Sequence, residues 1–120
     1  MKLEVWQKSR ALVRDVYEVS GSFPRAEQFG LTHQIRKAAI SIPSNIAEGA
    51  GRGSGRDRRN FVLVARGSAF EVETQLFLAE DLGYVSSRKG TELRQRASQI
   101  ARMLTGLIRY YSSKPVTSNQ

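Results

Sequence analysis

Short clusters of glycine and proline divide this chain into four long stretches, and each stretch repeats apolar residues with the period of an α-helix. In the last stretch, from about Ser87 to Tyr111, the apolar residues are separated by 4, 3, 4, 3 and 4 positions: Leu93, Ala97, Ile100, Leu104, Leu107 and Tyr111. This spacing places them all on one helix face and is typical of a seam between packed helices. A chain with four such faces must bury them against one another.

The first three stretches carry the same pattern. Helices are predicted over about 3–20, over about 32–49 after a short turn at 24–27, and from Ser54 to a stop at Gly83. Asp57 follows Ser54 by three residues, an arrangement in which the side chains of the first turn cap a helix. No segment alternates strictly enough to indicate a strand. The sequence therefore predicts an all-α protein, an up-down antiparallel four-helix bundle.

A length of 120 residues leaves room for one domain. We expect the bundle to occupy residues 1–112, and residues 113–120, which have no core-forming pattern, to form a flexible C-terminal tail. No apolar run approaches the roughly 20 residues that cross a bilayer, and the N-terminus has no apolar signal core. The expectation is a cytoplasmic protein without a membrane partner.

Cysteine is absent and histidine occurs once, at His33. Zinc–thiolate sites, iron–sulfur clusters and cysteine nucleophiles are therefore excluded, and we expect no metal and no cofactor. Arg25 precedes His33 by eight residues, a wider spacing than the Arg–His pair of helical-bundle ribonucleases, and no nucleotide-binding glycine motif is present. The sequence predicts a protein that is not an enzyme.

Basic residues exceed acidic ones by 19 to 11, which gives a net charge of +8. This excess favours a polyanionic partner, RNA or DNA. It is concentrated around the glycine-rich connection, where residues 51–66 hold five arginines and one aspartate. We predict that nucleic acid binds there without strong sequence preference; a solvated charged face is the alternative. The candidate residues are Arg52, Arg56, Arg58 and Arg59, followed by Arg36 and Lys37.

A proline lies inside the apolar stripe of the second helix, in a motif that we expect to be structural: Ser41, Pro43, Asn45, Glu48 and Gly49. Pro43 removes one backbone donor and predicts a kink. Ser41 and Asn45 are expected to satisfy backbone groups that the proline frees, and Glu48 to pair with Arg52 four residues later. The alternative is a ligand site at the kink, with Asn45 and Glu48 as the binding residues.

Several segments of the chain occur together, and in order, in a known family. They are Trp6–Lys8, Phe23–Leu31, Gln34–Gly49, Ala65–Thr74 and Met103–Ile108. Over roughly residues 3–112 the chain resembles the bacterial four helix bundle protein family, whose first members are encoded in intervening sequences of 23S ribosomal RNA genes. The resemblance implies an up-down bundle that assembles into ring-like pentamers. The chain is also similar to the accessory protein of diversity-generating retroelements, a basic pentamer that binds nucleic acid and its polymerase.

Independently of that resemblance, the helices carry more apolar residues than one small bundle encloses. Six residues are hard to place all inside it: Phe29, Ile40, Val62, Phe70, Phe77 and Leu78. An exposed apolar patch of that size marks an interface. We therefore expect a homo-oligomer, and the resemblance implies a pentamer. The alternative function is that of a structural adaptor that binds another protein, such as a polymerase.

Overall fold

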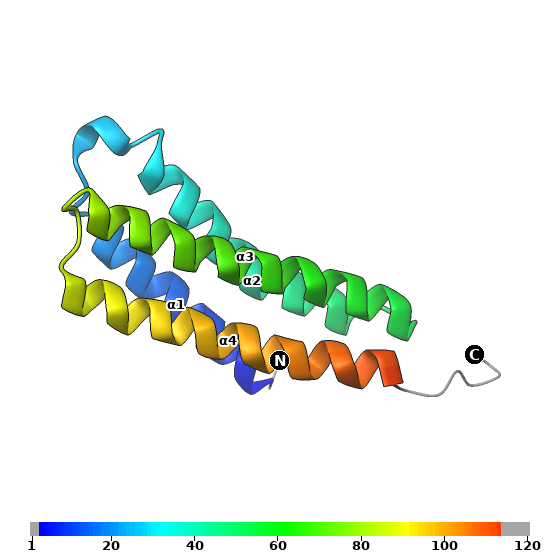
Figure 1. Cartoon of the computed structure of the whole chain (residues 1–120). Coiled ribbons are helices and arrows are strands. Elements are labelled where there is room, and N and C mark those ends of the chain that lie inside the picture. The colour runs from blue at the N-terminus through cyan, green and yellow to red at the C-terminus, as the bar shows by residue number, and fades with distance from the viewer. Residues whose placement is uncertain (1–2, 114–120) are drawn as a thin grey trace.

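The computed structural model describes residues 3–113, which form four long helices that run alternately up and down (Figure 1). The helices are α1, Glu4–Ser20; α2, Leu31–Ala50; α3, Gly55–Asp81; and α4, Ser87–Ser113, with a short 3-10 helix η1, Arg25–Glu27, between α1 and α2. No strand occurs among the described residues. The prediction of an all-α, up-down four-helix bundle is confirmed.

Each long helix packs against two neighbours around the bundle. α2 lies between α1 and α3, and α4 closes the circle between α3 and α1, so α1 and α3 are diagonal to one another. The bundle is elongated, with principal extents of 54 × 24 × 21 Å. One end, which we call the α2–α3 end, holds the connection between those helices (residues 51–54) and the last turn of α4 (Figure 1). The turns α1–α2 and α3–α4 lie at the other end.

Both ends of α3 are fixed by short-range hydrogen bonds. The Ser54 hydroxyl oxygen accepts a hydrogen bond from the backbone N–H of Asp57 at 3.1 Å, which confirms the predicted cap. At the other end Gly83 has a φ of 78°, a left-handed conformation that favours glycine. The backbone N–H of Tyr84 then reaches back to the carbonyl of Ala79 at 2.8 Å, which closes the helix.

A carboxylate in η1 holds the start of α2. Glu27 accepts hydrogen bonds from the backbone N–H of Leu31 at 3.0 Å and from the hydroxyl of Tyr84 at 2.9 Å. These bonds, that of Leu31 first, lower the pKa of Glu27, and the bond to the carboxylate raises the pKa of Tyr84. The ring of Phe23 packs 5.6 Å from that of Tyr84. The two turns at this end of the bundle are thus tied together.

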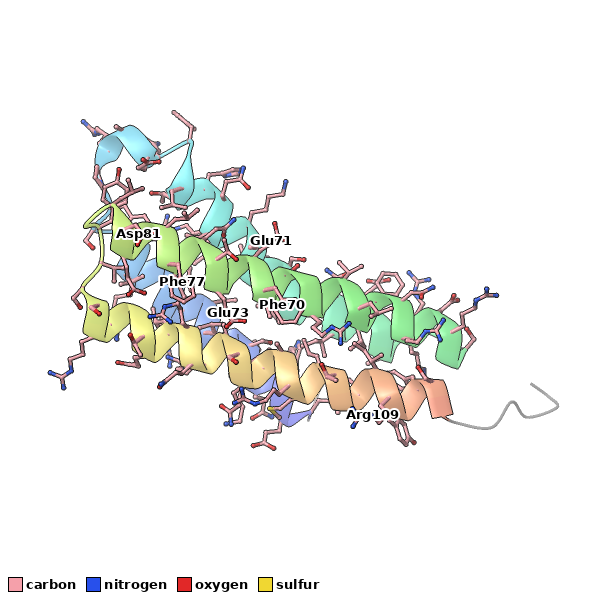
Figure 2. All side chains as sticks on the ribbon, in the orientation of Figure 1. Phe70, Glu71, Glu73, Phe77, Asp81 and Arg109 are labelled. Atoms are coloured by element: carbon pink, nitrogen blue, oxygen red, sulfur yellow. The ribbon has the colours of Figure 1, made fainter. Side chains whose placement is uncertain are left out.

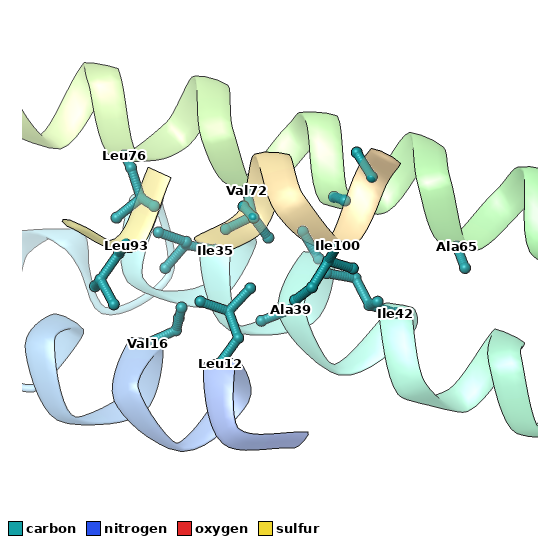
Figure 3. Close-up of a cluster of buried hydrophobic side chains, with 14 of the residues drawn as sticks. Leu12, Val16, Ile35, Ala39, Ile42, Ala65, Val72, Leu76, Leu93 and Ile100 are labelled. Atoms are coloured by element: carbon teal, nitrogen blue, oxygen red, sulfur yellow. The ribbon is translucent and has the colours of Figure 1, made fainter. Parts of the chain in front are cut away.

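All four helices contribute side chains to one continuous core (Figure 3). Its largest enclosed members are Leu12, Val16, Ile35, Ile42, Ile46, Val62, Val72, Leu76, Leu93, Ile100 and Leu104. The predicted α4 stripe is buried from Leu93 to Leu104, whereas Leu107 and Tyr111 are only partly buried. The core therefore thins towards the α2–α3 end.

Five of the six apolar residues that the sequence analysis finds hard to enclose in one bundle are exposed: Phe29, Ile40, Phe70, Phe77 and Leu78. The sixth, Val62, is 1% exposed and continues the buried α3 stripe of Ala65, Ala69, Val72 and Leu76. A glycine on the facing helix contributes to its enclosure. A Cβ atom at Gly49 would lie 3.1 Å from Cβ of Phe61 and 3.7 Å from Cγ2 of Val62. The missing side chain lets α2 approach α3 closely enough to enclose Val62.

The helix α4 continues to Ser113, one residue past the predicted domain boundary. Residues 114–120, most of the predicted flexible tail, lie outside the described residues, so the tail stays a prediction. None of the helices in residues 3–113 is long and apolar enough to cross a membrane.

Candidate nucleic-acid interface

The α2–α3 end brings together the four arginines that the sequence ranks first. α2 ends at Ala50, three residues with two glycines follow, and Ser54 caps the new helix. Arg52 lies in this connection, and the other three arginines, Arg56, Arg58 and Arg59, lie in the first turns of α3. A tight glycine-containing turn followed at once by a capped helix therefore concentrates four cations within eight residues.

Two of these arginines are held in place by the chain itself. Arg52 pairs with Glu48 at 2.7 Å, as the four-residue spacing predicts, and its guanidinium lies 4.6 Å from the ring centre of Phe61. Nε of Arg58 donates a hydrogen bond to the carbonyl of Arg52 at 2.6 Å, and its guanidinium lies 5.9 Å from the ring centre of Tyr111. The remaining N–H groups of Arg58 have no carboxylate partner among the described residues. Such an arginine is positioned in advance for an external anion.

The other two arginines differ from each other. Arg56 is exposed and makes no hydrogen bond or ion pair with the described residues. Arg59 is partly buried, and its Nε atom is enclosed without a hydrogen-bond partner. In residues 3–113 neither charge has a carboxylate within 4 Å. The connection therefore presents positive charge that the described residues do not neutralise.

Arg36 and Lys37 are not part of this group. Lys37 precedes the end of α2 at Ala50 by 13 residues, which is about 20 Å of helix. Nε of Arg36 donates to the hydroxyl of Ser20 at 2.8 Å, and Nη2 donates to the carbonyl of Tyr17 at 3.1 Å, so this side chain caps the end of α1. The two second-ranked candidates thus lie on the α1–α2 side of the bundle, away from the first four.

The proline motif of α2 forms a polar contact between helices. Nδ2 of Asn45 donates to both the carbonyl and the hydroxyl of Ser41 at 2.9 Å, and the hydroxyl of Ser68 on α3 donates to the same Ser41 hydroxyl at 2.8 Å. α2 continues through Pro43 to Ala50. Asn45 and Ser68 both bond to Ser41, so the motif links α2 to α3. The carbonyl that Pro43 deprives of its helical donor is that of Ala39, and none of these bonds reaches it, so the predicted compensation for the proline stays a prediction.

Three further arginines lie along α3 and α4 and are absent from the ranked candidates, and one of them, Arg102, lies close enough to Glu73 to lower its pKa. They are Arg66 of α3 and Arg102 and Arg109 of α4. Arg66 donates to the hydroxyl of Thr105 at 3.1 Å, and Figure 2 shows Arg109 towards the C-terminal end of α4. One sequence signal could have found the α4 pair, because no Asp or Glu follows Glu92 anywhere in the chain.

The acidic side chains gather elsewhere, mainly on the second half of α3. Glu80 is paired with Arg94 of α4 at 2.7 Å, and both side chains are largely buried. Partial burial raises the pKa of Glu73, and the nearby charges of Arg102 and Arg94 oppose that shift. Glu71 and Asp81 are exposed. In residues 3–113 no three His, Asp or Glu side chains gather to hold a metal ion.

The chain matches the model of one protein family, described as 23S rRNA-intervening sequence protein, over residues 1–106. A similar solved structure is the crystal structure of a protein with unknown function from the S23 ribosomal protein family of Bacteroides thetaiotaomicron. The two chains are 23% identical with a TM-score of 0.78, and the match covers 87% of this chain and 97% of that one. At that identity the likeness supports the fold. No curated protein matches. Neither description names an enzymatic activity.

Proposed function

This chain belongs to the 23S rRNA-intervening sequence protein family, and from that membership we propose that it is a non-enzymatic, homo-oligomeric helix bundle that binds the backbone of nucleic acid. The observation that carries the proposal is the group of arginines at the α2–α3 end. Residues 51–66 hold five arginines and one aspartate, and the α4 segment that ends beside them contains no carboxylate after Glu92. Such a surface attracts any polyanion.

The contacts favour phosphate over bases. Guanidinium groups bind phosphate oxygens in pairs, and Arg58 is already oriented by its bond to the Arg52 carbonyl. Two of the aromatic rings at this end, those of Phe61 and Tyr111, already have an arginine guanidinium against them. Contacts to the sugar–phosphate backbone carry no sequence information, so binding is expected to tolerate many sequences.

Assembly multiplies such contacts. The resemblance to the family implies a ring of five copies, and a ring repeats the arginine group around one axis. Individual contacts that are weak then add up through multivalency. The half-exposed phenylalanines on α3 give the chain an apolar surface that a neighbouring copy can cover.

The test is a titration of fluorescent duplex DNA and single-stranded RNA with the purified protein, followed by fluorescence anisotropy between about 20 and 300 mM salt. On duplex DNA the logarithm of the binding constant should fall with the logarithm of the salt concentration by about 0.9 per phosphate neutralised. The variant Arg56→Ala/Arg58→Ala/Arg59→Ala should bind more weakly and with a flatter slope. Circular dichroism checks that the bundle remains folded.

A matched control removes the same charge from another part of the surface. Arg14, Arg25 and Arg88 are exposed and lie outside the α2–α3 end. Their triple replacement by alanine should change the salt slope much less than the replacement of Arg56, Arg58 and Arg59. Equal effects of the two triple variants would contradict the site. Absence of binding by the parent protein at low salt would instead favour the alternative, an adaptor that binds another protein such as a polymerase.

A further inference from the structure

The second half of α3 combines half-exposed aromatic rings with carboxylates that form no ion pair. We call this surface the acidic face, and it consists of Phe70, Glu71, Glu73, Phe77, Leu78 and Asp81; Figure 2 labels all of these except Leu78. Phe70 and Phe77 are 50% and 49% exposed. In the part of the chain that the structure describes, Glu71, Glu73 and Asp81 form no ion pair. Glu73 and Asp81 lie four residues before and after Phe77, so one ring has a carboxylate one turn away on each side.

These carboxylates are not placed to stabilise their own helix. Asp81 is the last residue of α3, where the macrodipole disfavours a negative charge. The cation that α4 offers at this level, Arg94, is already committed to Glu80 and stacks 3.8 Å from the ring centre of Phe77. The charges of Arg102 and Arg94 act on Glu73, but in residues 3–113 no carboxylate of the acidic face forms an ion pair, so the face can accept further cations.

A complementary surface lies between α1 and α2. There a hollow of about 440 Å³ is lined by seven side chains: Tyr17, Gln28, Thr32, His33, Arg36, Lys37 and Ile40. Tyr17 and Ile40 are 40% and 42% exposed and give the hollow an apolar wall. Arg36 is held 4.4 Å from the ring centre of Tyr17, and Lys37 has no carboxylate partner among the described residues. We call this surface the basic hollow.

One copy of the chain cannot bring the two surfaces together. α1 and α3 are diagonal in the bundle and do not pack on each other, so α2 separates the hollow from the outer side of α3. The two surfaces are nevertheless complementary in character: a half-exposed ring with a carboxylate one turn away on each side, and a hollow whose lining combines an apolar wall with two cations, Arg36 and Lys37. Complementary potentials of this kind orient two partners and fix their register.

We propose that the acidic face of one copy docks into the basic hollow of the next copy, with Phe77 against Tyr17 and Ile40, and with Glu73 and Asp81 facing Arg36 and Lys37. The contact joins two different surfaces, so each copy keeps one acidic face and one basic hollow for further neighbours. Repetition of such a contact produces a closed ring or an open filament. The inference rests on the homo-oligomer of the proposed function and assigns the surfaces that build it.

The contact is tested with two variants that each disable one surface. Phe77→Asp places a charge on the protruding ring position, and Ile40→Asp places one in the wall of the hollow. Each variant alone should be a monomer by sedimentation velocity at tens of micromolar, because each change should weaken the contact by roughly 30-fold or more. An equimolar mixture should form a one-to-one pair and nothing larger, because only one intact contact can form.

Val64→Asp is the matched control, because Val64 is a 52% exposed apolar residue on the first half of α3. This variant should keep the mass of the parent protein, and circular dichroism should show all three variants to be folded. Single variants that keep the parental mass, or a mixture that remains monomeric, would overturn the contact. A monomeric parent would overturn it too, together with the homo-oligomer.

DNA binding by the same two variants tests the nucleic-acid proposal independently of assembly. The arginines of the α2–α3 end are untouched in the Phe77→Asp and Ile40→Asp monomers, so these should still bind DNA at low salt, more weakly than the assembled parent. Variants that no longer assemble but still bind DNA in a salt-dependent way would show that the contact between copies and the nucleic-acid site are separate surfaces. A parent that assembles through this contact and binds no nucleic acid would overturn the nucleic-acid proposal alone.

Discussion

The two halves of α3 carry opposite surfaces on one continuous helix. Residues 55–69 contain four arginines and one aspartate, whereas residues 70–81 contain four carboxylates and no cation. Both halves oppose the helix macrodipole, which favours anions at the start of a helix and cations at its end. Charges that are placed against the local preference of their own helix point to interactions outside it.

The halves also differ in how their charges are held. In the first half the chain orients its own arginines, as Arg58 beside Tyr111 and Arg66 beside Thr105 show. In the second half only Glu80 forms an ion pair with a described residue, and Glu73 and Asp81 each lie one helical turn from the half-exposed ring of Phe77. Positioned arginines that no described carboxylate neutralises suit a flexible polyanion, whereas carboxylates around a ring suit a shaped protein surface.

The largest expected effect on stability comes from a buried residue of the second half of α3, and it should differ clearly from that of its exposed neighbour. Leu76 is fully enclosed, and its neighbour Phe77 is half exposed. In the monomeric Ile40→Asp background, Leu76→Ala should lower the free energy of unfolding by about 2–5 kcal/mol, because it leaves a cavity in the core. Phe77→Ala should cost under about 1 kcal/mol, mainly the contact with Arg94. Urea denaturation measures both, and equal losses would show that Phe77 is a core residue.

The second prediction concerns the one neutralised carboxylate of this half. Glu80→Ala should cost roughly 2–3 kcal/mol in the same background, because it leaves Arg94 largely buried without its partner. Asp81→Ala should leave the unfolding free energy nearly unchanged, because that side chain is exposed and unpaired. A loss at Asp81 as large as that at Glu80 would contradict the separation between structural and docking carboxylates.

Sequence reasoning succeeded wherever the controlling contacts are local. The Ser54 cap and the Glu48–Arg52 pair join residues three and four positions apart, and the stripe from Leu93 to Leu104 is a repeat within one helix. The burial of Val62 is local too, because Val62, Ala65, Ala69, Val72 and Leu76 follow one another at 3, 4, 3 and 4 positions on one face of α3. The failures lie in contacts between helices, which decide where an arginine finds its partners.

The candidate site shows the same division. Grouping Arg56, Arg58 and Arg59 required only their nearness along the chain, and the structure keeps them together at one end. Arg36 was grouped with them because of its charge, yet its partners Ser20 and Tyr17 lie on another helix, 16 and 19 residues away. Net charge thus predicts a class of partner, and the packing of helices decides which cations share a surface.

A third prediction separates two arginines of the first half. Arg58→Ala should cost about 1 kcal/mol of stability in addition to binding, because it loses the bond to the Arg52 carbonyl and the contact with Tyr111. Arg56→Ala should weaken binding and leave the urea midpoint unchanged, because Arg56 is exposed and forms no hydrogen bond or ion pair with the described residues. Equal stability of the two variants would show that Arg58 is not held by the bundle.

The smallest expected effect is that of the Glu73 charge on the free energy of unfolding. Burial raises the pKa of Glu73 from its ordinary value of 4.5, so the folded chain binds this proton more tightly than the unfolded chain. Stability attributable to Glu73 is therefore present below the ordinary value and is lost as the pH rises through the raised one. In the Ile40→Asp monomer, Glu73→Gln should gain slightly in unfolding free energy at pH 7 and lose that pH dependence.

The same substitution should act in the opposite direction on assembly. In the otherwise unchanged chain, Glu73→Gln removes a carboxylate that faces the cations of the neighbouring hollow, so dissociation by sedimentation should occur at higher protein concentration. If Glu73 lowers the stability of a single copy and strengthens the contact between copies, its role lies in that contact. If Glu73→Gln stabilised the monomer and left assembly unchanged, the carboxylate would have no part in docking, and Asp81 would remain as the acidic partner to test.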